Sequence, residues 1–233
     1  MNRFSFTSFV LFAFSSAALF AADPKDEVKA AARKLGDEAN YSWTATPKSE
    51  GDSIAAGAGA MEGQAEKGGI TYVTMSVGNN DVEMAFKGDK AAIKREDEWQ
   101  ATDELEGNNA WIAARLKVFK APVAEAEELL GKIEDLKKAE GVYSGELSDS
   151  AVKEFISRGR RRGGNDAEEV KGWAKFWIKD GVLSKYQYNV QGKLTVGQDK
   201  REVSINRTMT VDIKEIGSTT LKVPAAAKKK LEK

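Results

Sequence analysis

Alternating apolar and polar residues in the C-terminal part of the chain constrain its fold more than any other feature. Gly172 to Ile178 and Val182 to Val190 both alternate in this way, and Asp180-Gly181 stands between them. A period of two places every second side chain on one face of a strand, and Asp-Gly is a turn pair that joins antiparallel neighbours. The sequence therefore predicts a long β-hairpin, and Leu194 to Val196 and Glu202 to Ile213 extend the same sheet.

Shorter strands are expected earlier in the chain. Asn40 to Thr46 alternates aromatic or small residues with polar ones, and we expect this strand to stop before Pro47. From Met61 to Trp99, short alternating runs separated by turn residues predict a meander of about four strands. A second hairpin is expected from Lys132 to Leu136 and Val142 to Leu147, which brings the total to about nine or ten antiparallel strands.

Helical spacing of apolar residues marks the segments between and beside these strands. Pro24 to Ala39 combines an early proline and early acids with apolar residues three and four positions apart. Further helices are expected from Thr102 toward Phe119, after Pro122, from Ser148 to Gly159 and after Pro224.

Together these elements predict one domain of the α+β class over residues 23–233, since no linker divides the chain. The expected architecture is a strongly curved antiparallel sheet, a half-barrel, with helices covering its concave side. Such a sheet leaves an apolar cavity in which a hydrophobic ligand would fit.

The first 22 residues, Met1 to Ala22, have the pattern of a signal peptide. Arg3 is followed by an apolar run from Phe4 to Phe20 and by small alanines suited to a peptidase. A retained membrane anchor is the alternative, although serines and threonines interrupt the apolar run. We therefore expect an exported protein, periplasmic or secreted after cleavage.

The absence of two residue types narrows the possible chemistry. The chain has no Cys and no His, which excludes disulfides, a lipid-attachment thiol, thiolate or imidazole metal sites and every His-dependent catalytic triad. Carboxylate pairs, a Ser-Lys pair or an all-carboxylate cation site stay possible. The adjacent acids Asp97-Glu98, Asp103-Glu104 and Glu127-Glu128 are expected to be exposed. We expect a protein that is not an enzyme and has no cofactor or metal.

The overall charge bears on possible partners. The chain has 36 basic and 36 acidic residues, so no net field would attract a polyanion, and we expect no nucleic-acid partner. One local exception is the group Arg158, Arg160, Arg161 and Arg162. It could bind an anionic membrane surface or an envelope partner. The alternative is favourable charge at a helix C-terminus followed by a solvated loop.

Arg207 is the first candidate for ligand binding, because it lies where the alternation of its strand predicts an apolar side chain. A cation at the mouth of the cavity could pair with a phosphate or carboxylate headgroup. The alternative is an Arg that pairs with an internal acid or extends to water at the rim of the sheet. Trp43, Tyr72, Trp177 and Tyr186 could line the pocket, or could be ordinary core and cross-strand packing.

Two segments carry a family resemblance. They are VYSGELSDSAVKEFI at Val142 to Ile156 and AKFWIKDGVLSKYQYNV at Ala174 to Val190, followed by a late exit strand at Val223-Pro224. Their order resembles the periplasmic lipoprotein-carrier family (LolA) and the related LppX/LprG lipoproteins. The resemblance implies a curved sheet covered by helices and a partner that is a lipid or an acylated protein. Because the chain lacks a lipid-attachment Cys, it implies a soluble carrier.

Two other functions stay open at this point. One is an envelope interaction or sensor protein with a fully packed core and a basic docking loop, and the other is a carboxylate glycosidase. A carrier needs an apolar void of about several hundred Å³, whereas a glycosidase needs facing acids about 5 to 10 Å apart in a cleft.

Overall fold

The structure is a computed structural model that describes residues 23–50, 59–158, 167–196 and 199–232. The expected signal peptide, Met1 to Ala22, lies outside the described residues. So do Arg160, Arg161 and Arg162 of the predicted basic group.

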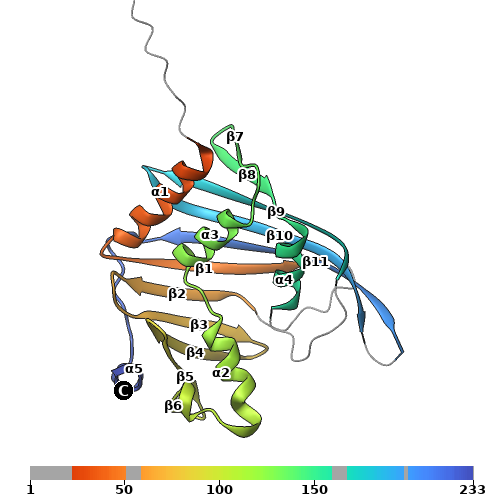
Figure 1. Cartoon of the computed structure of the whole chain (residues 1–233). Helices are drawn as coiled ribbons and strands as arrows, with labels where there is room; N and C mark the ends of the chain where they lie inside the picture. The colour runs from red at the N-terminus through yellow and green to blue at the C-terminus, as the bar shows by residue number, and fades with distance from the viewer. Residues whose placement is uncertain (1–22, 51–58, 159–166, 197–198, 233) are drawn as a thin grey trace, which may run out of the picture.

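One antiparallel sheet organises this part of the chain (Figure 1). Its eleven described strands have the order β6-β5-β4-β3-β2-β1-β11-β10-β9-β8-β7. Because β6 and β7 are edges that do not pair with each other, the curved sheet is open, as the half-barrel prediction requires. The strands are β1 (Asn40–Ser49), β2 (Met61–Glu66), β3 (Thr71–Val77), β4 (Asn80–Lys87), β5 (Lys90–Arg95), β6 (Glu98–Ala101), β7 (Lys137–Ala139), β8 (Val142–Glu146), β9 (Glu168–Lys179), β10 (Val182–Val196) and β11 (Arg201–Lys214).

Four of the five described α-helices cover the concave face, which confirms the predicted fold class. Figure 1 shows α1, α3 and α4 in front of β9, β10, β11 and β1, and α2 in front of β4 and β5. The fifth, α5, lies on the opposite, convex face, where Ala227 and Leu231 pack against Ala85, Ala92 and Trp99. The helices are α1 (Pro24–Asp37), α2 (Ala110–Lys117), α3 (Pro122–Gly131), α4 (Asp149–Ser157) and α5 (Ala225–Glu232).

Local chemistry fixes the helix starts that the sequence predicts. The Asp23 carboxylate accepts a hydrogen bond from the Lys25 amide at 2.8 Å, and Pro24 occupies the first turn of α1. At α4 the Ser148 hydroxyl accepts from the Ala151 amide at 3.4 Å. Both side chains satisfy amides that a helix start leaves without a partner.

The hairpin of β9 and β10 is present as predicted. Asp180 and Gly181 form its turn with φ of 54° and 75°, the left-handed pair that a two-residue turn of this kind requires. Phe176 on β9 is in register with Tyr186 on β10. The alternation therefore points one apolar row into the core, as expected.

Two strand boundaries differ from the prediction. The first strand continues through Pro47, which pairs with Met209 on β11, whereas β2 pairs with β1 only as far as Ala45. A proline is tolerated there because one side of β1 is already free of ladder partners. No separate strand begins at Leu194, because β10 runs unbroken to Val196.

Other differences concern residues 102–139 and the exit strand. The expected strand Lys132 to Leu136 is wrong: α3 extends to Gly131, Ile133 makes one isolated bridge to Leu147, and β7 begins at Lys137. The helix expected from Thr102 is divided into the 3-10 turns η1 (Thr102–Glu104) and η2 (Gly107–Asn109) before α2, since Gly107 has a φ of 58°. Val223-Pro224 forms no strand.

Candidate ligand-binding face

The concave face has two parts. The first, which we call the closed half, is the part of β9, β10 and β11 that α1, α3 and α4 cover (Figure 1). Phe155 on α4 and Phe176 and Tyr186 on the sheet are fully buried there. Interiors with such large, nearly inaccessible side chains are close-packed, so this part of the interior is filled by the protein itself.

A buried carboxylate joins α3 to the sheet inside the closed half. The Tyr186 hydroxyl donates to Glu125 Oε2 at 2.6 Å, and the Tyr188 hydroxyl donates to Glu125 Oε1 at 3.3 Å. Burial raises the pKa of Glu125 above its ordinary value, and the two tyrosine hydrogen bonds partly oppose that effect. Burial also raises the pKa of both tyrosines well above its ordinary value. The tyrosines therefore stay protonated donors.

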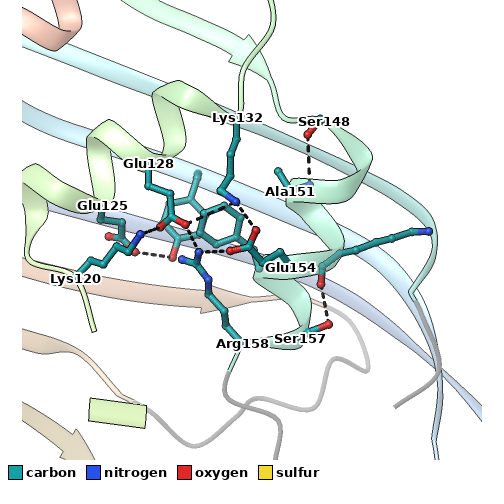
Figure 2. A network of polar contacts seen from close by, with 12 residues as sticks. Lys120, Glu125, Glu128, Lys132, Ser148, Ala151, Glu154, Ser157 and Arg158 are labelled. Atoms are coloured by element: carbon teal, nitrogen blue, oxygen red, sulfur yellow. Dashed lines mark hydrogen bonds and ion pairs between the residues drawn. The ribbon is translucent and has the colours of Figure 1, made fainter. Parts of the chain in front are cut away.

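A network of ion pairs connects α3 to α4 at the edge of the closed half (Figure 2). Arg158 pairs with Glu128 on α3 and, at 2.6 Å, with Glu154 on α4. Lys132 contacts the same two carboxylates, and Lys120 pairs with Glu128 at 3.1 Å. Burial alone would raise the pKa of Glu128, but the hydrogen bonds from Arg158 and Lys120 outweigh it and lower that pKa. Hydrogen bonds from Lys132 and Arg158 lower the pKa of Glu154.

This network changes the interpretation of Arg158. The sequence places Arg158 in an exposed basic group, yet its guanidinium is bound by two carboxylates and lies over the Phe155 ring at 4.1 Å from the centroid. The expected exposure of Glu128 is wrong for the same reason, because its carboxylate is half-buried within the network. Arg158 holds the C-terminal end of α4 against α3.

The second part of the concave face is an apolar row that its neighbours only partly bury. Met61, Met75 and Val82 are in register across β2, β3 and β4, and the row reaches Ala45 on β1. Met209 on β11 lies one step further, opposite Pro47. We call Met61, Met75, Val82 and Met209 the open strip; all four are partly buried and pack against the main core.

The helices leave the middle of the open strip, Met61 on β2 and Met75 on β3, uncovered. In Figure 1, α2 is in front of β4 and β5, α3 and α4 are in front of β10, β11 and β1, and β2 and β3 lie between them. Met75 is two positions from Val73, which belongs to the main core under the concave-side helices, so the strip is on the concave face. The strip is therefore apolar surface inside the curve of the sheet that keeps contact with solvent.

Arg207 lies at the border between the closed half and the open strip. It is two positions from Met209 on β11 and in register with Val190 on β10. Its Nη2 donates to the Phe155 carbonyl of α4 at 2.9 Å, and its charge partly opposes the rise in the pKa of Tyr188. The period of β11 thus predicts the face of Arg207 correctly, and among the described residues it forms no ion pair.

The four predicted aromatic residues are not brought together. Trp43 is buried on the concave face and its ring lies over Gly63, where a β-carbon would be 2.0 Å from Trp43 Cζ2. Tyr186 is buried beneath α3. Tyr72 packs beside α5 on the convex face. Trp177 on β9 is also on the convex face, with Lys185 Nζ 5.4 Å from its ring centroid. Tyr72 and Trp177 are thus separated from Arg207 by the sheet.

Two surface pockets are hollowed at other places. One has a volume of about 530 Å³ and is lined mainly by charged residues around Lys25, Glu27 and Glu134, where α1 begins. The other measures about 280 Å³ and lies between the β4–β5 turn and the segment that joins α2 to α3. Neither is the enclosed apolar void expected from the sequence. The accessible apolar surface lies along the open strip instead.

Some of these features could not be found from the sequence. Glu125 and Glu128 look like ordinary exposed acids of an amphipathic helix, because their tyrosine and arginine partners are 30 to 63 positions away. Met61 and Met75 lie on short strands whose alternation gives no sign of which face a helix covers. Within the described residues, no group of three or more His, Cys, Asp or Glu side chains could hold a metal ion. No described helix combines the length and the apolar character needed to cross a membrane.

Comparison with known proteins identifies similar folds. No family model matches the chain, and no curated protein matches it in sequence. Among solved structures, the Mycobacterium tuberculosis lipoprotein LppX is 14% identical, with a TM-score of 0.49 over 85% of this chain and 97% of that one. LprF from Mycobacterium bovis is 8% identical, with a TM-score of 0.44 over 88% and 97%. A LolA superfamily protein from Nitrosomonas europaea is 9% identical, with a TM-score of 0.34 over 86% and 96%.

These matches agree with the resemblance that the sequence predicts. They concern the arrangement of sheet and helices, and at these identities and TM-scores they identify no ligand and no site residue. The site must therefore be argued from its own residues.

Proposed function

We propose that this protein is a non-enzymatic, exported carrier or binding protein that holds an acyl chain of a lipid or acylated protein against the open strip. The observation that carries the proposal is the row of Met61, Met75 and Val82, together with Met209, on the concave face. Methionine side chains are flexible and polarizable, so they adapt to apolar ligands of varied shape. Apolar surface that is concave and only partly covered is typical of ligand sites.

Arg207 supplies a polar end to this site. A guanidinium has five N–H donors, and the Phe155 carbonyl is its hydrogen-bond acceptor among the described residues. The remaining donors suit a phosphate or carboxylate headgroup, which a guanidinium can bind with two parallel hydrogen bonds. An acyl chain lying along β11, β1 and β2 would then place its anionic end beside Arg207.

Direct titration with a fluorescent fatty acid tests the proposal. Met75→Lys places a charge in the middle of the strip and is expected to lower affinity at least about tenfold, because a chain would have to cover an ammonium group. The matched control is Thr74→Lys, which adds the same charge to the adjacent residue on the opposite face of β3. The proposal predicts that Thr74→Lys binds like the unmodified protein. Equal affinity of all three proteins would refute it.

Arg207→Leu tests binding of the headgroup separately from binding of the acyl chain. This variant is expected to lose binding of the fatty acid anion and to keep binding of the corresponding uncharged methyl ester. If both ligands bind the variant as they bind the unmodified protein, Arg207 is not the headgroup anchor. Circular dichroism and thermal unfolding of each variant establish that the fold is retained.

The filled closed half favours a second function, an envelope interaction protein that holds no ligand. Phe155, Phe176 and Tyr186 leave that part of the face packed, as the interaction hypothesis expects. Fatty acid titration distinguishes the two functions, because an interaction protein would show no saturable binding. That hypothesis also needs a basic docking group, and Arg158 is less available for it because its guanidinium pairs with Glu128 and Glu154.

A further inference from the structure

The outward face of α2 carries exposed apolar side chains. These residues include three exposed large hydrophobic side chains: Val118, 60% exposed, and Trp111 and Val77, each 38% exposed. Trp111 is on α2 and Val118 is its C-cap residue. Arg115 lies between them in sequence, and spacings of four and three place Trp111, Arg115 and Val118 on one face of the helix.

The opposite face of α2 is anchored in the core. Ala113 and Leu116 are buried, and the Phe119 ring, just after the helix, stacks on Phe86 of β4 with centroids 4.2 Å apart. These contacts fix the rotation of the helix about its axis. The outward position of Trp111 and Val118 is therefore a consequence of packing on the inner side.

The charge of this helix has a single sign. Residues 107–124 contain Arg115, Lys117 and Lys120 and no acid, in a chain whose total charges balance. Lys120 pairs with Glu128, whereas Arg115 and Lys117 form no ion pair with any described residue. The guanidinium of Arg115 lies 5.9 Å from the centroid of the Trp111 ring.

Few acids oppose this charge. Asp103 and Glu106 precede α2 in the chain, close to its N-terminus, where negative charge suits the helix dipole. Asp89 and Lys90 face the pocket that Lys117 also lines, and their charges cancel. The outward face of α2 therefore combines the apolar Trp111 and Val118 with the charge of Arg115, and the exposed Lys117 lies at its side, four positions from Ala113.

We propose that the outward face of α2 docks onto an anionic phospholipid surface. Trp111 and Val118 would enter the headgroup region, where indole rings are favoured, and Arg115 and Lys117 would contact lipid phosphates. Charge complementarity supports this partner over an acidic or neutral one. Because the helix has only eight residues and two apolar anchors, the association is weak and reversible.

Docking through α2 would also determine where the open strip lies relative to the lipid surface. The helix lies in front of β4 and β5, next to β2 and β3, which carry Met61 and Met75 of the open strip (Figure 1). A protein docked through α2 would hold the strip close to the lipid surface. The docking inference stands on α2 alone, however, and vesicle binding can fail while fatty acid binding succeeds, or the reverse.

Sedimentation with vesicles tests the inference, with the chain from Asp23 onward, which contains every described element. The protein is expected to bind vesicles of equal parts phosphatidylcholine and phosphatidylglycerol, and not vesicles of phosphatidylcholine alone. Arg115→Gln with Lys117→Gln should weaken binding by about fivefold per charge removed. The control, Lys228→Gln with Lys229→Gln, removes two exposed charges from α5 and should leave binding unchanged.

The apolar anchors have their own control. Val118→Ser is expected to weaken vesicle binding severalfold, whereas Val77→Ser, which changes an exposed valine outside α2, should not. Brominated phospholipids should quench the fluorescence of the unmodified protein, and Trp111→Phe should remove that quenching. Equal binding to neutral vesicles, or binding that survives the α2 substitutions, would overturn the inference. So would concentration-dependent dimerisation that these substitutions abolish, because α2 would then contact a second copy.

Discussion

The closed half and the open strip share one sheet face but differ in what covers them. Over β9, β10 and β11, three helices fill the concave face and an ion-pair network holds α3 to α4. Over β2 and β3, the same face carries Met61 and Met75 with partial exposure. The difference is one of coverage: one part of the face is packed by helices, and the other keeps apolar side chains in partial contact with solvent.

The largest difference between the two parts is expected from core truncation. Phe176 on β9 is fully buried, so Phe176→Ala should lower the free energy of unfolding by about 3–5 kcal/mol. Met75→Ala in the open strip should lower it by only about 1 kcal/mol, because much of the side chain already contacts water. Urea denaturation measures both. Equal losses would mean that the strip is part of the packed core.

The ion-pair network should contribute the next largest effect. Arg158→Met removes one of the two cations that contact both Glu128 and Glu154, leaving Lys132, and should cost about 1.5–3 kcal/mol. Lys137→Met, which breaks an exposed pair with Asp135, should cost less than about 1 kcal/mol. A double-mutant cycle of Arg158 with Glu128 measures their coupling. A coupling near zero would show that α4 is held by packing alone.

The contact of Trp43 with Gly63 tests the region beside the open strip. A β-carbon at Gly63 would lie 2.0 Å from the Trp43 ring, so Gly63→Ala should destabilise the protein by about 2 kcal/mol. Gly131→Ala is the matched control, because no atom lies within 4 Å of its added β-carbon, and it should be neutral or slightly stabilising. Thermal unfolding compares the two variants, and equal midpoints would contradict the flat packing of Trp43.

The smallest expected effect is a pH dependence confined to the closed half. The pKa of Glu125 is raised in the folded protein, so its charge weakens folding above that pKa and the penalty disappears as the pH falls toward 4.5. Glu125→Gln should therefore be more stable than the unmodified protein at pH 7, and this advantage should shrink toward pH 4.5. Urea denaturation across that range measures the difference, and an advantage that grows on acidification would contradict the assignment.

Glu128 and Glu154 have the opposite pH dependence. Their pKa values are lowered in the folded protein, so the stability they contribute is complete above the ordinary value of 4.5 and is lost as the pH falls through the lowered values. Glu125→Gln leaves these carboxylates in place. Its difference from the unmodified protein therefore isolates Glu125 from the network.

The sequence predicts best what depends on near neighbours. The β9–β10 hairpin follows from Asp180-Gly181 and its flanking alternation, and the face of Arg207 follows from the period of β11. Alternation does not say which face becomes concave, so it leaves open whether Tyr72 and Trp177 line a pocket or pack on the convex face, where the structure places them. Which face a helix covers is decided by contacts between distant elements.

The ion-pair network between α3 and α4 could not be predicted from the sequence for the same reason. Arg158 is part of an exposed basic run when only its neighbours are considered, and its role depends on Glu128, 30 positions earlier. The end of α3 at Gly131 likewise displaces the strand expected at Lys132 to Leu136. Pairings of this range follow from the three-dimensional fold, and no local pattern in the sequence contains them.

Native mass spectrometry of the protein isolated from its own host tests the central claim most directly. The account predicts a retained acyl-containing molecule that is lost in Met75→Lys and kept in Thr74→Lys, since these adjacent side chains lie on opposite faces of β3. A bare protein mass for the unmodified chain, or equal retention by both variants, would contradict a ligand site on the open strip.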